Sequence, residues 1–169
     1  MDNFVQLPII APYAQSLGGD PFWIGLVVSL YSLSNMAGNV LAGWWIDKGG
    51  RKRVMLFGLV VAALSLTFYT WVPTVQMLAL VRFFHGLGGG FLVPAAYAFL
   101  SDRTKEEGRG RAMAFSGAAI GLAAILGPAY GGVLGQRLGL DWVFLSIAGL
   151  LLVTACLVTF VLVDPFPAG

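Results

Sequence analysis

The stretch Gly-Trp-Trp-Ile-Asp-Lys-Gly-Gly-Arg-Lys at residues 43–52 gathers charges and glycines between two long apolar runs. Residues 22–46 before it and residues 54–72 after it carry no charged side chain outside the stretch itself. A helix of roughly 20 apolar residues crosses the hydrocarbon core of a bilayer. The stretch is therefore interpreted as a short connection at a membrane surface, where Gly50 permits a tight turn with positive φ.

The whole composition agrees with a membrane protein. Hydrophobic residues make up 58% of the chain, charged residues only 11%, and the mean hydropathy is +0.83. A soluble domain carries roughly 25% charged residues. The chain has too few charges to solvate a globular surface, so its first partner is the lipid bilayer.

Apolar runs continue on both sides of the stretch and predict an all-α membrane protein, because backbone in lipid must satisfy its own hydrogen bonds. We expect one six-helix bundle over residues 1–169. The first run would reach only about 25 Å as one helix, which indicates either a truncated first helix or a thinned bilayer. The expected spans are residues 1–17, 22–46, 54–72, 75–100, 112–134 and 142–163.

Basic residues predict the orientation. Eight of the ten lie in two connections, and cytoplasmic connections carry the excess of Lys and Arg. We therefore expect both termini in the cytoplasm, a plasma (inner) membrane location, and no nucleic acid partner. The eight are Lys48, Arg51, Lys52, Arg53, Arg103, Lys105, Arg109 and Arg111.

A short internal repeat links two connections. Residues 43–50 and residues 132–139 both read glycine, three residues, a polar–basic pair, one residue and glycine. The two copies would end on opposite membrane faces. This pattern favours two three-helix repeats of inverted topology, an architecture common in transporters.

The stretch at residues 43–52 resembles the signature between helices two and three of the major facilitator superfamily. Residues 82–86 resemble the fourth-helix element of that family, which has arginine followed by a glycine four residues on. Residues 107–112 resemble the start of its fifth helix, and residues 127–132 its glycine–proline motif typical of proton-linked exporters. The resemblance covers nearly all of the chain, but only the N-terminal half of a usual twelve-helix member.

The resemblance implies a half-size secondary transporter, with proton-coupled export of a small molecule by alternating access. It also implies a homodimer or a second six-helix half, because substrate would pass between two halves. The alternative is a non-transporting fragment or a membrane assembly module. No enzyme motif is present, and a lone Cys156 offers no metal-ligand spacing, so we expect no enzyme, cofactor or metal.

Three residues are candidates for proton coupling: Arg82, Asp2 and His85. A guanidinium inside a span needs a partner, and Arg82 could bias Asp2 between its charged and protonated states or simply tie helices together. His85 lies one turn away and could carry a proton or be a packing residue. Asp2 could instead be the N-cap of its helix.

The remaining candidates belong to motifs or to polar positions in spans. Asp47 would pair with Arg51, and the resemblance also pairs Asp102 with the arginines of the connection; the basic cluster could alternatively be only a topology signal. Small residues at four-residue spacing, Ser34, Gly38 and Ala42, suit contact with another helix, which we expect to lie in the missing half. The sets are Gly43, Asp47, Gly50, Arg51, Lys52 and Asp102 for conformational switching; Gly127, Pro128, Gly131 and Gly132 for the fifth-helix motif; Gln6, Tyr13 and Asn35 for cavity lining or interhelical hydrogen bonds; and Gly86, Gly88, Gly89 and Gly90 for close packing or a gate.

Overall fold

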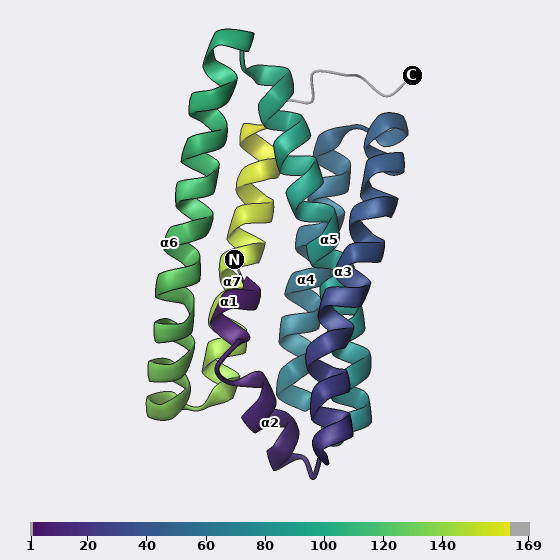
Figure 1. Cartoon of the computed structure of the whole chain (residues 1–169), viewed down its shortest axis with the longest axis vertical. Helices are drawn as coiled ribbons and strands as arrows, with labels where there is room; N and C mark the ends of the chain where they lie inside the picture. Colours follow the sequence, from purple (N-terminus) through teal and green to yellow (C-terminus); the bar gives the residue numbers. More distant parts are fainter. Residues whose placement is uncertain (1, 163–169) are drawn as a thin grey trace.

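The chain forms a bundle of helices in a computed structural model that describes residues 2–162 (Figure 1). Residues 1 and 163, the outer ends of the expected first and sixth spans, lie outside this range, as do both termini. The elements in order are α1 (Asp2–Gln6), α2 (Ile10–Ser16), α3 (Pro21–Gly49), α4 (Arg51–Phe68), the short 3-10 helix η1 (Tyr69–Trp71), α5 (Val75–Arg103), α6 (Glu106–Leu138) and α7 (Leu140–Val161).

Five helices of the described range are long and apolar enough to cross a membrane: α3, α4 continued by η1, α5, α6 and α7. Their outward faces carry large apolar side chains that a soluble protein would bury. Phe160 is 81% exposed, Val40 73% and Ile125 73%. Such a surface is stable in hydrocarbon and would aggregate in water. The chain is therefore a multi-pass membrane protein.

The expectation of one continuous first helix is wrong. The segment is two short helices, α1 and α2, separated by residues 7–9. Pro8 has no backbone N–H to donate, and its ring disfavours helical geometry at the preceding Leu7. The chain re-enters a helix when the Tyr13 N–H donates to the Ile9 carbonyl at 2.9 Å. In Figure 1, α1 starts near the middle of the bundle and α2 lies at its lower end.

Local chemistry explains where the long helices begin. The Asp20 carboxylate accepts from the Trp23 N–H at 2.9 Å, with Pro21 at the first helical position of α3. Thr74 caps α5 in the same way through the Met77 N–H at 3.3 Å. These caps satisfy donors that the first helical turn leaves free.

The two joints of the internal repeat have the same backbone conformation. Gly50 is the single residue between α3 and α4, with φ 83° and ψ 152°. Gly139 is the single residue between α6 and α7, with φ 95° and ψ 162°. A side chain is strained at such positive φ, so the repeated glycine has a local structural reason.

Most of the residues expected in the basic connections lie in the ends of helices instead. Arg109 and Arg111 lie in α6, and Asp102 lies in the last turn of α5 rather than after it.

Glycine contacts hold α3 and α5 together at backbone distance. A methyl group on Gly86 would overlap the Ser34 hydroxyl and the Tyr31 carbonyl. One on Gly90 would lie 2.8 Å from the Cα of Gly38. Ser34 and Ala42 are buried, 1% and 0% exposed. The small-residue stripe of α3 is thus occupied by α5 of the same chain, and assigning it to a partner was wrong.

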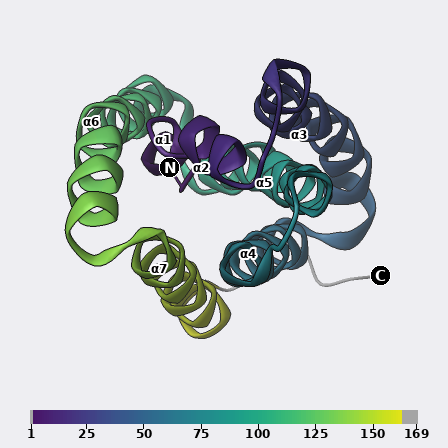
Figure 2. The ribbon, with the colours of Figure 1, turned by 90° about the horizontal axis from the view of Figure 1, so that it is seen from below.

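Helix α6 stands apart from this packed group (Figure 2). Among its described residues only Gly127 and Gly131 are buried. A methyl group on Gly131 would overlap the Val5 carbonyl, and one on Gly127 would lie 2.9 Å from the Phe4 Cβ. The fifth-helix motif therefore provides the close approach of α1 to α6, while most of α6 remains exposed.

Candidate proton-binding site

Four buried polar side chains meet inside the bundle. Asp2 and Gln6 lie on α1, and Arg82 and His85 lie on α5, with exposed fractions of 6%, 1%, 2% and 0%. Residues four apart and three apart share one face of a helix. The antiparallel helices α1 and α5 therefore present two facing pairs, Asp2 opposite His85 and Gln6 opposite Arg82.

Arg82 ties three helices together. Its Nε donates to the Val27 carbonyl of α3 at 3.2 Å. One terminal nitrogen donates to the Gln6 Oε1 at 3.0 Å and approaches the Asn3 Oδ1 at 3.5 Å, both on α1. These acceptors offset a cost of at least about 2.5–3.5 kcal/mol for a guanidinium at mid-membrane.

The Asp2 carboxylate contacts His85. Asp2 Oδ2 lies 2.6 Å from the imidazole Nε2, and Asp2 Oδ1 accepts from the Asn3 N–H at 2.7 Å. The Asp2 carboxylate therefore contacts His85, whereas from the sequence we expected it to contact Arg82. The other oxygen accepts from the N–H of the adjacent residue, which is not the bond of an N-cap to the second or third helical residue.

Aromatic rings enclose the imidazole. Tyr31 and Tyr69 contact it edge-on, with ring centroids 5.2 and 5.6 Å away. The Tyr69 hydroxyl lies 3.2 Å from the imidazole Nδ1, and the Arg82 guanidinium lies 4.7 Å over the Tyr31 ring. Sequence reasoning missed both tyrosines. Helical spacing gives the face of one helix but not the rotation of its neighbours.

The cluster is suited to holding one proton. A carboxylate and a guanidinium balance each other, and the imidazole between them is the side chain whose charge changes most readily near neutral pH. Within residues 2–162, no three metal-ligating side chains are grouped closely enough to hold a metal ion. The described side chains of the cluster are hydrogen-bond donors and acceptors around one imidazole.

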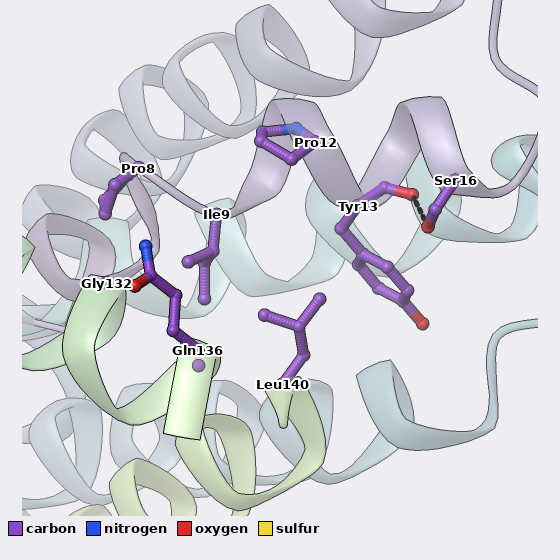
Figure 3. Close-up of a pocket in the computed structure, with 9 residues that line it drawn as sticks. Pro8, Ile9, Pro12, Tyr13, Ser16, Gly132, Gln136 and Leu140 are labelled. Carbon is purple, nitrogen blue, oxygen red and sulfur yellow. Dashed lines mark hydrogen bonds between the residues drawn. The ribbon is translucent and has the colours of Figure 1, made fainter. Parts of the chain in front are cut away.

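A pocket of about 330 Å³ opens at the break between α1 and α2 (Figure 3). Pro8, Pro12 and Gln136 line it, and the ring of Tyr13 forms one wall. The Tyr13 hydroxyl donates to the Tyr69 carbonyl at 2.7 Å. The Tyr69 ring in turn stacks on Phe144 at 4.8 Å. An aromatic layer therefore separates this pocket from His85.

The motif at residues 43–52 forms ties at the opposite end of the bundle. Arg51 Nε lies 2.7 Å from an Asp102 oxygen and joins α4 to α5. Lys52 Nζ donates to the Thr159 carbonyl at 2.7 Å and joins α4 to α7. Asp47 is exposed, and the ion pair of Arg51 is with Asp102 instead. A methyl group on Gly43 would meet no atom within 4 Å.

The other candidates are mainly structural ties. Asn35 donates to the Gly86 carbonyl at 3.3 Å and accepts from Asn39 at 3.2 Å. Gly88 and Gly89 pack against Val61 and Tyr31, so the geometry of these α5 glycines is that of close packing. On α6, Pro128 lies inside the helix, and Gly132 lines the pocket of Figure 3.

Long apolar helices around a buried cluster of polar and charged side chains define a multi-pass membrane protein. The comparison with known families agrees with this class and narrows it: the chain belongs to the Major Facilitator Superfamily, whose family model matches residues 1–169. This family consists of transporters, so the resemblance and the expectation of a non-enzyme are both confirmed.

Similar curated proteins have names that refer to multidrug resistance or to transport. The chain is 33% identical over 146 residues to "Multidrug resistance protein 3" of Bacillus subtilis, covering 85% of this chain and 28% of that protein. It is 26% identical over 156 residues to "Multidrug resistance protein 2" of the same organism, covering 92% and 39%. It is 30% identical over 146 residues to "Inner membrane transport protein YajR" of Escherichia coli, covering 86% and 32%. The chain thus spans about a third of the length of these relatives.

Proposed function

We propose that this chain is a half-size secondary transporter that exports a small molecule in exchange for protons by alternating access. The observation that carries the proposal is the buried contact of 2.6 Å between Asp2 and His85, beside the Arg82–Gln6 pair. A proton taken up there changes the charge of a dehydrated site, which is the usual role of intramembrane ionisable groups in transporters. The names of the multidrug relatives support an amphipathic substrate.

The proposed architecture has six spans, with α1 and α2 together forming the first, arranged as two inverted three-helix repeats. The matching glycine joints at Gly50 and Gly139 support the repeat. The proposed location is the plasma (inner) membrane with both termini cytoplasmic. The gathering of eight of the ten basic residues at one end of the bundle supports this orientation.

Transport in proteoliposomes tests the function. With the purified chain reconstituted, we expect a fluorescent amphipathic dye to be moved against its gradient only when a pH gradient is imposed. His85→Asn should lose most of this pH-driven accumulation, because asparagine cannot take up a proton. Gln76→Asn, an exposed change on the same helix, should leave it intact. Accumulation that survives in His85→Asn would remove the imidazole from the mechanism.

A second unit completes the proposed transporter, either another copy of this chain or a different half. Faces that stay exposed within residues 2–162 support the pairing: Gly43, Val40 and Trp44 on α3 are exposed, and two glycines are the only buried residues of α6 in this range. Binding groups near the midplane of such transporters come from both units.

Cysteine cross-linking in native membranes tests the pairing. After Cys156→Ala, Gly43→Cys should form a cross-linked adduct, because Gly43 lies on the uncovered face. Leu64→Cys on α4, 53% exposed, should remain uncross-linked as the matched control. An adduct of twice the chain mass identifies a homodimer, and any other mass a different half. A monomer that still transports would contradict the pairing.

A further inference from the structure

The side-chain amide of Gln6 lies between the two basic groups of the cluster. Its Oε1 accepts from Arg82 at 3.0 Å, and its Nε2 lies 3.5 Å from the His85 Nδ1. Gln6 is 1% exposed, so water cannot replace either partner freely. This amide is a direct hydrogen-bonded link between Arg82 and His85.

The orientation of the amide is dictated by Arg82. A guanidinium has five N–H donors and no acceptor, and it stays charged in proteins. The Gln6 oxygen must therefore face Arg82, and the amide NH₂ must face His85. An amide NH₂ can only donate, so the imidazole Nδ1 is held as an acceptor. The ring proton then sits on Nε2 and is donated to Asp2.

We propose that Gln6 is a positioning residue that converts proton uptake by His85 into the loss of one contact between α1 and α5, an inference that rests on the proposed proton-coupled function. A proton that binds Nδ1 makes that atom a donor. The Gln6 NH₂ then faces a donor, and turning the amide over would set the same NH₂ against Arg82. No orientation of one amide satisfies both cations, so a contact between α1 and α5 must break.

The other groups around the ring do not remove this conflict. Asp2, on α1, faces the opposite nitrogen and stabilises the charged ring. Tyr69, on η1, can rotate its hydroxyl from donor to acceptor, and Tyr31, on α3, meets the ring by its edge. Arg82, on α5, keeps its charge throughout. Tyr31 and Tyr69 also contact both Arg82 and His85, but a ring edge and a rotating hydroxyl can adapt to the added proton, whereas the Gln6 amide cannot.

The protonation state of His85 can be observed directly, because the chain has a single histidine. Nitrogen-15 NMR of histidine-labelled protein in lipid nanodiscs, purified without a histidine tag, reports which ring nitrogens carry protons. In wild-type protein we expect the neutral form of the ring to carry its proton on Nε2. Gln6→Glu supplies an acceptor to both neighbours and should raise the ratio of charged to neutral ring about tenfold or more.

Two further variants complete the experiment. Gln6→Met removes the donor to Nδ1 and should also raise the charged fraction, which keeps the test available if Gln6→Glu does not fold. Gln76→Glu makes the same chemical change at an exposed site of α5 and should match wild type. A wild-type ring protonated on Nδ1, or Gln6 variants that titrate like wild type, would overturn the role of Gln6. The NMR result does not depend on transport, so failure of dye transport would count against the proposed function alone.

Discussion

Replacing Gly86 by alanine is expected to destabilise the bundle, although the same change in an exposed helix normally stabilises by about 1 kcal/mol. The added methyl group would overlap the Ser34 hydroxyl and the Tyr31 carbonyl on α3. A backbone carbonyl cannot move aside without separating the helices. Overpacking of this kind costs typically about 1–3 kcal/mol, so the net sign should reverse.

Gly121→Ala is the matched control, because a methyl group there would meet nothing within 4 Å. We expect it to be neutral or mildly stabilising. Unfolding by increasing fractions of a denaturing detergent, followed by tryptophan fluorescence, measures both variants against wild type. Equal stabilities for Gly86→Ala and Gly121→Ala would show that α3 and α5 are not held at backbone distance.

Gly86 faces the backbone of another helix and Gly121 faces open space, a difference that the sequence alone does not show. Small residues at four-residue spacing predict that a helix packs closely along that stripe. For Ser34, Gly38 and Ala42 this was correct, but the stripe does not name its neighbour. The neighbour is α5, whose own glycines at 86 and 90 complete the contact.

The long apolar helices could be predicted because hydropathy depends only on composition along the chain. The observed helix ends differ from the expected span ends by a few residues. Capping by Asp20 or Thr74 and continuation of a helix into polar residues are local effects that hydropathy does not describe. The break in the first span lies at Pro8, whose missing N–H disfavours a continuous helix. The apolar run continues across this proline, so hydropathy alone predicts one span there.

The polar cluster was predicted in part. Arg82, His85 and Asp2 were singled out because charges inside spans are costly. The contacts among these residues could not be predicted, because the partner of a buried group depends on helix rotation and on neutral residues such as Gln6. In contrast, the contact of Arg51 with Asp102 agrees with the pairing that the family resemblance implied. A motif at fixed spacing carries three-dimensional information that composition does not.

Replacement of Arg82 is expected to have the largest effect on transport, because this guanidinium holds acceptors on both α1 and α3. Arg82→Lys keeps the charge but loses the planar fork of donors. One ammonium cannot hold the contacts with Val27 and Gln6 in the same geometry. Leaving one buried acceptor unsatisfied costs about 1–3 kcal/mol, so we expect pH-driven dye accumulation to fall about tenfold or more while the protein remains in the membrane.

Arg82→Gln separates the two roles of this residue. If Arg82 takes part in coupling, the variant should lose pH-driven accumulation but retain downhill dye movement without a pH gradient. If Arg82 only ties helices, both modes of transport should fall together with the resistance to denaturing detergent. Arg137→Gln, an exposed arginine at the end of α6, is the matched control and should behave like wild type. Full pH-driven accumulation by Arg82→Gln would eliminate the coupling role, because the positive charge that balances Asp2 would then be dispensable.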